Sequence, residues 1–399
     1  MPSATATSDF TSEQLLNHPE DARCKVAVIW IDWYAYHVGR FRGILSHPEL
    51  GSAALGIEMV GGTGVHQGLK FREDLPSDLR VETLMPESGW HEVGKLQLAI
   101  KLWKVLSRFN PEVVLVPGYY TLPGIAAALW AKVHDAKSVL MTESTEDDHH
   151  RVWWKEKLKA LLVQNLFDWA VTGGKAHVRY LEHLGFPLSR IGHFYDVVEN
   201  GVYQEYKARL RQRSRESFDL PARYFLYIGR LAPEKNVAGL IRAWNYYRAL
   251  GGTWPLVLVG GGPAVDELKN MATRSAYSSD LHFAGHKGSQ DLPRYYGFAG
   301  CFVLPSSREP WGLVVNEAMA SGLPVIVSDR CGCAEDLVIP DVNGMIFDPA
   351  NDENLTVCML KISSLDSTEL SHMGTRSREI IERYSPQNFG REVARIVNA

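Results

Sequence analysis

The sequence predicts two doubly wound α/β domains. Short runs of nearly continuous apolar residues recur along the chain, and such runs are typical of parallel strands covered by helices on both faces. Amphipathic helical stretches, such as 124–136 and 237–250, separate these runs. Because the strand–helix alternation continues through 399 residues, it exceeds what one open sheet accommodates. Two Rossmann-like domains that face each other across a cleft are therefore expected.

The expected strands fall into two sets. The first set comprises 25–31, 80–85, 113–118, 137–142 and 169–174. The second set comprises 224–229, 255–262, 281–285, 301–306 and 324–328. Between them lies a polar segment that carries five basic residues from Lys207 to Arg215 and ends at Pro221. We interpret it as a solvated linker helix, with a phosphate-binding strip as the alternative. We expect a loose tail over 1–23, a first domain over 24–200 and a second over 201–375.

Composition excludes several classes of protein. Hydrophobic residues make up 45% and charged residues 22% of the chain, which is ordinary for a globular enzyme. The net charge of −4 argues against general nucleic-acid binding. Five scattered cysteines indicate a reducing compartment rather than a disulfide framework, and Cys331 and Cys333 fit a plain loop better than a metal site. Without an apolar leader or a spanning run, we expect a cytoplasmic protein, at most peripheral on the inner face of the membrane.

The first residues that indicate chemistry follow the strand 224–229. Arg230 stands at its carboxyl end, and Lys235 shares the loop that leads to a helix near Val237. An arginine fork and a lysine beside a helix N-terminus suit a diphosphate. The alternative is a pair of solvated surface cations.

The stretch from Ser306 to Val325 contains two glutamates around a proline and a glycine. Pro310 fits at or just before a helix start, which leaves Glu309 outside the helix and Glu317 within it. The backbone N–H groups at Gly312 and Leu313 would then be free for a phosphate or a sugar hydroxyl. A buried carboxylate at Glu317 needs hydrogen-bond donors, which a ribose diol would supply. The alternatives are that Glu317 pairs with a buried cation or that it points to water.

These motifs resemble family 4 of the retaining glycosyltransferases, the relatives of sucrose synthase and glycogen synthase, which have the GT-B fold. The resemblance rests on the Glu309–Glu317 spacing with Trp311 and Gly312 between. It also rests on five segments in order: "VVENGV" (197–202), "YIGRLAPEKN" (227–236), "LVLVGGGP" (256–263), "SGLPVIVSD" (321–329) and "VNGMIFDP" (342–349). The last segment, 376–399, is similar to the family's final helix, which crosses back to the first domain.

The resemblance implies a transfer of sugar from a nucleotide-diphosphate sugar, UDP- or GDP-linked, to a hydroxyl acceptor in polysaccharide, glycoconjugate or glycolipid biosynthesis. Arg230 and Lys235 would bind the diphosphate, Glu317 the ribose and Glu309 the donor sugar. The remaining donor-side residues would be Trp311, Gly312, Leu313 and Val314 around the sugar and phosphate, and His286 and Lys287 near the base. No metal or other cofactor is expected, because protein cations and the helix dipole stabilise the leaving group.

The first half departs from the family pattern. Gly39, expected on the donor side, and Arg40 are loose counterparts of the family's glycine pair. Glu143 stands where many members carry a histidine, and we expect it to position an acceptor hydroxyl rather than to cap the next helix. The expected acceptor side also includes Arg40, Tyr119 and Ser144. The loop "CGCAED" replaces a Gly-Gly-x-Glu loop and keeps Glu335. The cluster 147–150 fits solvated loop charges better than a metal site.

A basic amphipathic stretch, 151–163, carries Trp154, Leu158, Leu161 and Leu162 on one helical face. It could dock on an anionic membrane that holds a lipid-linked acceptor, although a core-facing stripe is the alternative. Three other functions compete with transfer. They are a nucleotide-sugar epimerase of the same overall fold, a glycoside hydrolase using Glu309 and Glu317, and a non-catalytic nucleotide-binding protein.

Overall fold

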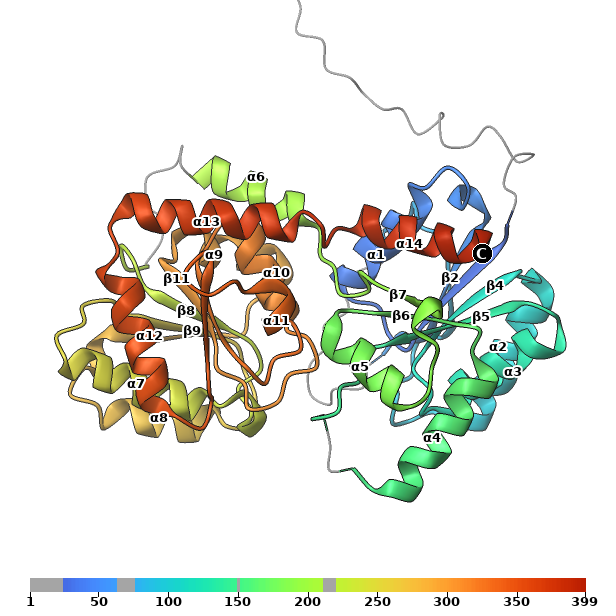
Figure 1. Cartoon of the computed structure of the whole chain (residues 1–399), viewed down its shortest axis with the longest axis horizontal. Coiled ribbons are helices and arrows are strands. Elements are labelled where there is room, and N and C mark those ends of the chain that lie inside the picture. The colour runs from blue at the N-terminus through green and yellow to red at the C-terminus, as the bar shows by residue number, and fades with distance from the viewer. Residues whose placement is uncertain (1–23, 63–75, 149–150, 211–219) are drawn as a thin grey trace, which may run out of the picture.

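The computed structural model describes residues 24–62, 76–148, 151–210 and 220–399, and it contains two α/β domains side by side (Figure 1). The first sheet has the order β3-β2-β1-β4-β5-β6-β7 and the second the order β10-β9-β8-β11-β12-β13. Every strand pair in both sheets is parallel. The order therefore reverses between β1 and β4, and again between β8 and β11. Such switch points are where ligands bind in open α/β sheets.

The strands are short and mostly buried. The first sheet contains β1 (Val26–Trp30), β2 (Ala54–Val60), β3 (Val81–Met85), β4 (Val113–Pro117), β5 (Lys137–Thr142), β6 (Trp169–Thr172) and β7 (Ile191–Gly192). The second contains β8 (Phe225–Ile228), β9 (Leu256–Val259), β10 (Leu281–Gly285), β11 (Cys301–Leu304), β12 (Val325–Ser328) and β13 (Gly344–Phe347). All ten strands expected from the sequence are present.

Strand β2 was not expected, because Gly56 and Glu58 interrupt its apolar run. A Cβ at Gly56 would lie 2.6 Å from the Trp33 ring, so glycine lets that ring pack on the sheet. The buried Glu58 accepts a hydrogen bond from Thr83 Oγ1 of β3 at 2.7 Å. Tertiary contacts thus explain both residues in a buried strand.

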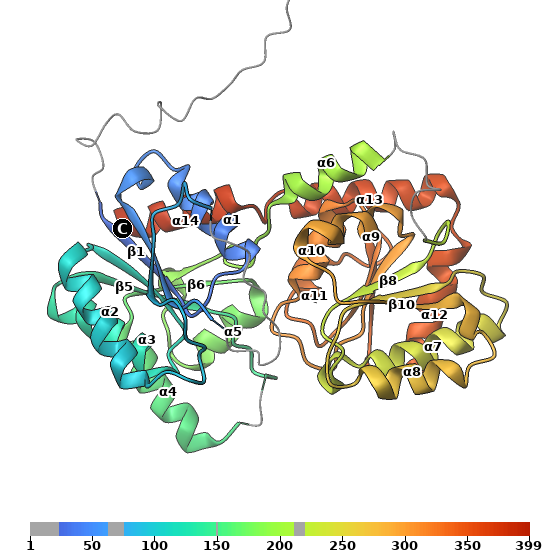
Figure 2. The ribbon, with the colours of Figure 1, turned by 180° about the vertical axis from the view of Figure 1, so that it is seen from behind.

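Helices cover both faces of each sheet, as the two views show (Figures 1 and 2). The first domain contains α1 (Ala35–Leu45), α2 (Lys95–Phe109), α3 (Leu122–Val133), α4 (Trp153–Leu166) and α5 (Lys175–His183). The later helices are α6 (Asn200–Leu210), α7 (Val237–Ala249), α8 (Val265–Thr273), α9 (Leu292–Phe298), α10 (Leu313–Ala320), α11 (Ala334–Leu337), α12 (Asp352–Ser364), α13 (Ser367–Ile381) and α14 (Pro386–Asn398).

The last two helices join the domains. Helix α13 lies on the second domain, and α14 crosses to pack against α1 of the first (Figure 2). The Ser385 side chain caps α14 by accepting a hydrogen bond from the Asn388 N–H, and Pro386 fills its first turn. A Cβ at Gly43 would lie 1.9 Å from the Pro386 carbonyl oxygen, and one at Gly390 would lie 2.1 Å from the Gly43 carbonyl oxygen. Glycines therefore permit the close crossing, and the expected return helix is confirmed.

The segment between the domains begins with helix α6, in line with the expected linker helix, and residues 201–206 of this helix are exposed or half-buried. Helix α6 packs against α9 and α10, and the Tyr203 ring lies 5.7 Å from the Tyr296 ring. The Asn200 side chain donates to the carbonyl oxygens of Ile381 and Tyr384, each at 3.1 Å. The basic run continues into 211–219, which lies outside the described residues, as does the predicted tail 1–23.

The apolar stripe of α4 faces solvent rather than the core. Trp154, Leu158 and Leu161 are 52%, 52% and 61% exposed, and Val163 is the buried residue of this helix. The core-facing alternative was therefore wrong. Within the described ranges, no helix is both long and apolar enough to cross a bilayer.

Candidate active site

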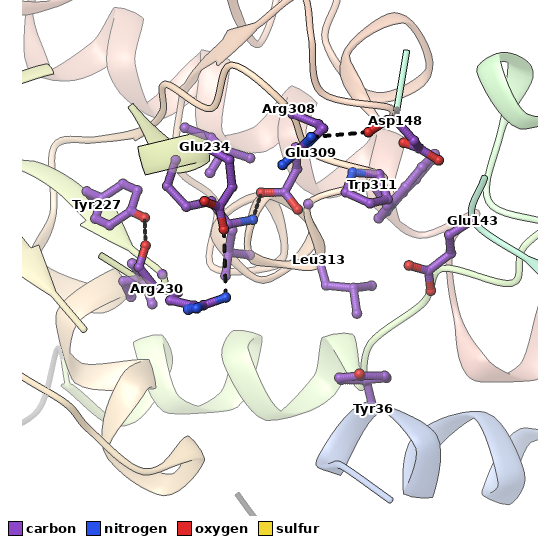
Figure 3. A pocket seen from close by; sticks show the side chains of 17 residues that line it. Tyr36, Glu143, Asp148, Tyr227, Arg230, Glu234, Arg308, Glu309, Trp311 and Leu313 are labelled. Atoms are coloured by element: carbon purple, nitrogen blue, oxygen red, sulfur yellow. Dashed lines mark hydrogen bonds and ion pairs between the residues drawn. The ribbon is translucent and has the colours of Figure 1, made fainter. Parts of the chain in front are cut away.

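A cavity of about 580 Å³ opens between the two domains, and we call it the main cavity (Figure 3). Loops after β5, β8 and β11 line it, so it lies at the carboxyl ends of strands from both sheets. Its walls carry most of the residues expected to act on the donor: Arg230, Lys235, Glu309, Trp311, Gly312, Leu313 and Val314. Glu143 and Tyr36 face them from the first domain.

Lys235 and Glu309 form an ion pair in the wall of the main cavity. Lys235 Nζ lies 2.5 Å from Glu309 Oε2, and Ser306 Oγ donates to the same oxygen at 3.2 Å. Both charged side chains are mostly buried, at 19% and 13% exposure. The pair therefore fixes the Glu309 carboxylate and leaves its second oxygen for a ligand.

Arg230 occupies the loop after β8, where it pairs with Glu234 at 3.7 Å and remains 39% exposed. The Tyr227 hydroxyl donates to its carbonyl oxygen at 2.8 Å. Gly260 lies behind this loop with a φ of 147°, and a Cβ there would lie 1.9 Å from the Gly229 carbonyl oxygen. Only glycine lets the β9 loop approach so closely, and the same holds at Gly262, where a Cβ would lie 2.4 Å from the Leu231 carbonyl oxygen.

The backbone after β11 is held by the "CGCAED" loop. The N–H of Gly332 donates to the Glu309 carbonyl oxygen at 3.0 Å, and that of Cys333 donates to the Trp311 carbonyl oxygen at 3.2 Å. Gly312 then adopts a left-handed φ of 105°, so α10 begins at Leu313 rather than at Pro310. The first N–H groups of α10 have no carbonyl in the preceding turn of the helix, and they point their positive dipole end at the main cavity.

The Trp311 side chain anchors this loop to the first domain. Its Nε1–H donates to Asn316 Oδ1 at 2.9 Å, and the Asn316 amide donates to the Asp196 carbonyl oxygen at 2.9 Å. Trp311 is only 1% exposed. The Trp311 ring therefore acts as an anchor between the domains rather than as a surface for a ligand.

His177 of α5 makes a second link between the domains. Its Nδ1 accepts a hydrogen bond from the Gly174 N–H at 3.1 Å, so Nε2 carries the proton and donates to the Pro310 carbonyl oxygen at 3.0 Å. Burial lowers the pKa of His177, which favours this neutral form. Sequence reasoning missed His177 and Asn316, because neither belongs to a recognised motif.

Glu317 does not line the main cavity. It faces a neighbouring hollow of about 360 Å³, which we call the aromatic hollow because Trp33, Tyr34, Tyr36, Tyr203 and Tyr206 also line it. The Tyr296 hydroxyl donates to Glu317 Oε2 at 2.6 Å, and the Tyr203 hydroxyl also donates to this carboxylate. Burial raises the pKa of Glu317, although both hydroxyls oppose this. These two hydrogen bonds stabilise the buried Glu317 carboxylate, so neither a buried cation nor water is needed to explain a glutamate there.

His286 and Lys287 line a smaller hollow of about 160 Å³, together with Gly229 and Arg230. Because Arg230 also lines the main cavity, the two spaces adjoin at this residue. The structure therefore brings the expected base-side and diphosphate-side residues together.

The first-domain expectations need correction at two positions. Gly39 and Arg40 lie within helix α1, not in a glycine loop, because the helix begins at Ala35. Gly39 faces Glu199 and lines the aromatic hollow rather than the main cavity. Arg40 is fully buried and pairs with Asp196 at 2.9 Å, so it cannot touch an acceptor directly. Sequence reasoning missed Asp196, because its partners Arg40 and Asn316 lie far from it along the chain.

The other acceptor-side residues lie around Glu143. The Tyr119 hydroxyl donates to Ser144 Oγ at 3.4 Å, but neither residue lines the main cavity. Glu143 does line it, and the next helix begins only at Trp153, so the helix-cap alternative was wrong.

The acidic cluster contacts the second domain at the cleft. Asp147 lies 3.8 Å from Arg330, and the Asp148 carbonyl oxygen accepts a hydrogen bond from Arg308 at 3.4 Å (Figure 3). His149 and His150 lie outside the described residues. Cys331 and Cys333 are buried free thiols, and the described part of the chain holds no group of three or more residues placed to bind a metal.

Comparisons with known proteins agree with this geometry. Residues 209–379 match the sequence model of a family described as glycosyl transferases group 1. The matched stretch runs from α6 to α13 and so covers the second domain. An O-antigen chain mannosyltransferase B of Escherichia coli is 33% identical over 146 residues, 36% of this chain and 38% of that protein. The sulfoquinovosyl transferase SQD2 of Arabidopsis thaliana is 23% identical over 318 residues, 72% of this chain and 57% of that protein.

The alignments with relatives are partial. An uncharacterized glycosyltransferase of Methanocaldococcus jannaschii is 29% identical over 171 residues, and the chain spans 43% of its length. Solved structures extend the likeness to both domains. The Anabaena protein HepE, solved in complex with UDP and glucose, has a TM-score of 0.72 and 17% identity over 94% of this chain and 100% of that one. The fold is GT-B, as the resemblance predicted.

Proposed function

We propose that the chain transfers a sugar from a nucleotide-diphosphate sugar to a hydroxyl acceptor, with retention of the anomeric configuration, as a member of glycosyltransferase family 4. The main cavity carries this proposal. On its second-domain side are Arg230, the Lys235–Glu309 pair and the N-terminus of α10, and across from them stands Glu143. Cations and a helix N-terminus bind a diphosphate, and a carboxylate on the opposite side can hold a hydroxyl group.

The donor would extend from the main cavity into the small hollow beside it. Its diphosphate would bind Arg230, Lys235 and the N–H groups of Leu313 and Val314. Its base would lie near His286 and Lys287, which share Arg230 with the main cavity. Its ribose would reach Glu317 where the aromatic hollow adjoins the main cavity at Tyr36, and would compete there with the tyrosine hydroxyls that donate to Glu317.

The proposed donor carries either UDP or GDP, and different relatives support each nucleotide. HepE was solved with UDP-glucose, which favours a uridine nucleotide. A Mycolicibacterium smegmatis relative, 29% identical over 176 residues, is named as a GDP-mannose-dependent mannosyltransferase, which favours guanosine. Other relatives are named glycogen synthase and mannosylfructose-phosphate synthase. Sugar transfer in the synthesis of polysaccharides or glycoconjugates is thus the shared theme.

The proposed mechanism is a front-face transfer. The bond between the anomeric carbon and the acceptor oxygen forms as the bond to the diphosphate breaks, and the acceptor proton passes to the departing diphosphate. Arg230, Lys235 and the α10 dipole stabilise the charge that develops on the leaving group. Glu309, held by Lys235, orients the donor sugar rather than attacking it. Since protein cations supply this stabilisation, transfer is expected to persist in the presence of EDTA.

The alternative functions fit the geometry less well. A hydrolase would need Glu309 and Glu317 on either side of one glycosidic bond, but Glu317 lines the aromatic hollow and is bound by two tyrosines. The comparisons do not favour an epimerase, because the relatives reported above are transferases or synthases.

We also propose that the first domain docks on the anionic inner face of a membrane to reach a lipid-linked acceptor. Helix α4 exposes Trp153 and Trp154, at 71% and 52%, and Lys157 and Lys155 lie 5.0 and 5.5 Å from the centres of these two rings. Apolar side chains beside ammonium groups match an anionic bilayer surface. Figures 1 and 2 place α2, α3 and α4 side by side, and the first two also expose large apolar residues such as Leu96 and Val133.

The first experiment combines a donor screen with product analysis. A true donor should raise the melting temperature in a panel of uridine, guanosine and adenosine diphosphates and their sugars. Proton NMR of the product made from that donor should show the donor's anomeric configuration. An inverted centre would reject the retaining assignment, and the absence of transfer with every donor and with simple sugar or lipid-linked acceptors would reject the function.

A further inference from the structure

A chain of three ionisable side chains runs from the core of the first domain to the main cavity. Arg40 Nη2 lies 2.9 Å from Asp196 Oδ1 and 3.8 Å from Glu143 Oε1. The side chains of Arg40 and Asp196 are fully buried, whereas that of Glu143 is 36% exposed and lines the main cavity. Asp196 thus lies on the core side of Glu143, and both carboxyl groups contact the same guanidinium group.

The two carboxyl groups cannot both be ionised in this arrangement without cost. Both carboxyl groups lie against the same nitrogen, Arg40 Nη2, and a hydrogen bond between them would require a proton on one of them. Among the described residues, Asp196 Oδ2 is buried without a donor, and Arg40 Nε and Nη1 are buried without an acceptor. A single shared proton supplies the missing donor, and it leaves one carboxylate to balance the charge of Arg40.

The surroundings favour protonation of the deeper group. Burial and the nearby Glu143 raise the pKa of Asp196, although Arg40 opposes them. The rings of Tyr195 and Tyr36 lie over the Arg40 guanidinium at 4.0 and 4.9 Å and shield it from water. Other titratable groups that interact with Asp196 or Glu143 are Tyr120, His177 and Cys333.

The position of Asp196 is also fixed from the second domain. Its carbonyl oxygen accepts the hydrogen bond from Asn316, which in turn accepts from Trp311. A Cβ at Gly173 would lie 2.2 Å from Asp196 Oδ2 and 2.9 Å from the Trp311 ring, so the carboxyl group and the indole together fill the space that a side chain would need there. The loop that contains Glu309 is therefore linked through Trp311 and Asn316 to the segment that carries Asp196.

We propose that Asp196 and Glu143 share one proton and that, through this bond, Asp196 positions Glu143 to accept a hydrogen bond from the acceptor hydroxyl. The role in acceptor binding rests on the proposed function. Asp196 is thus a positioning residue that acts through Glu143. Its proton holds one Glu143 oxygen and leaves the other directed at the main cavity. When the pair loses this proton at high pH, the two carboxylates repel each other and the acceptor is bound more weakly.

Asp196→Asn tests the positioning role. The asparagine keeps an oxygen for Arg40, and its amide donates to Glu143 at every pH. In the wild type, KM for the acceptor should rise about tenfold or more as pH rises and the pair loses its proton, the loss expected when a hydrogen bond to a charged group is broken. In Asp196→Asn this rise should disappear. Asp135→Asn, an exposed carboxyl at the far end of α3, is the matched control and should keep the wild-type profile. An identical rise in Asp196→Asn would overturn the positioning role.

Infrared spectroscopy tests the shared proton without any substrate. The wild type should show the C=O band of a protonated carboxyl group at neutral pH, and Asp196→Asn should lack it. Glu143→Gln, on the cavity surface, should shift the band because the partner of the proton changes. No band in the wild type would overturn the inference even if transfer is observed. A wild type that shows the band but transfers no sugar to any acceptor would instead reject the proposed function, and the acceptor role with it.

Discussion

At the residue scale, Lys235 has two roles and Arg230 has one. Both place a cation in the wall of the main cavity, but only Lys235 also pairs with Glu309. Arg230 is partly exposed and pairs loosely with Glu234, whereas Lys235 is mostly buried and holds Glu309 at 2.5 Å. Loss of Arg230 removes one cation from the cavity wall. Loss of Lys235 removes a cation and also leaves the Glu309 carboxylate without its main partner.

We therefore expect Arg230→Ala and Lys235→Ala each to weaken transfer by roughly 2–4 kcal/mol, measured as kcat/KM for the donor, with the larger loss in Lys235→Ala. Arg242→Ala is the matched control, because Arg242 pairs with Asp352 on the exposed face of α7. Wild-type kcat/KM in both site variants would show that these cations do not bind the diphosphate.

A substitution at Glu317 tests whether this residue binds the ribose of the donor. Glu317→Gln keeps an oxygen that can accept from Tyr296 but removes the negative charge. Because the ribose lies far from the reacting carbon, we expect KM for the donor to rise while kcat changes little. Steady-state kinetics with varied donor would measure both constants. If donor affinity is unaltered, Glu317 is a structural carboxylate that serves only Tyr296 and Tyr203.

The sequence predicted some of these residues and not others, for a physical reason. Arg230, Lys235 and Glu309 follow strand ends within short motifs, so local patterns placed them in the cavity wall. Asp196 could not be assigned in this way, since its partners Arg40 and Asn316 lie 156 and 120 residues away along the chain. The same holds for His177, whose acceptor is 133 residues away. Such roles depend on how the domains pack, which no local pattern encodes.

At the element scale, the site depends on one loop supporting another. The loop after β12 donates two backbone hydrogen bonds to the loop after β11, and Gly332 makes the close approach between them. A Cβ at Gly332 would lie 1.8 Å from the Pro310 carbonyl oxygen. The small residues of "CGCAED" are thus explained by packing against the segment that carries Glu309.

Gly332→Ala should therefore displace the Glu309 loop, abolish the donor-induced rise in melting temperature and cost roughly 1–3 kcal/mol of stability. Gly201→Ala provides the comparison, because a Cβ there has no neighbour within 4 Å. Donor titrations followed by thermal unfolding would compare the two variants. A Gly332→Ala protein that still responds fully to the donor would show that the loop tolerates the shift.

Helix α4 offers an element-scale test of membrane docking. The protein should co-sediment with vesicles that contain anionic lipid at low salt and should be released as ionic strength rises. The double substitution Leu158→Ser with Leu161→Ser should reduce binding, because it removes exposed apolar side chains from α4. Leu250→Ser removes a similar side chain, 67% exposed, from the second domain and should bind as the wild type does. Equal sedimentation of all three proteins would exclude α4 as the docking surface.

At the scale of the whole molecule, the two domains are held together by polar contacts and by α14. Besides the His177 and Asn316 links, the Lys175 N–H donates to Asp336 at 2.9 Å, and Arg179 pairs with Glu335 at 2.6 Å. These contacts join α5 to α11. Because Asp196 lies within the same interface, its ionisation should affect the stability of the folded chain as a whole.

The sign of that effect follows from the raised pKa of Asp196. In the window between its ordinary pKa in the unfolded chain and its higher pKa in the folded protein, the folded state binds one more proton. The free energy of unfolding should therefore fall as pH rises through this window. Asp196→Asn removes this proton, so its melting temperature should fall less with rising pH than that of the wild type, and the difference should grow towards neutral pH. Thermal unfolding of both proteins from acid to neutral pH measures it, with Asp135→Asn as the control. Parallel curves would mean that Asp196 is ionised in the folded protein and that Arg40 alone outweighs its burial.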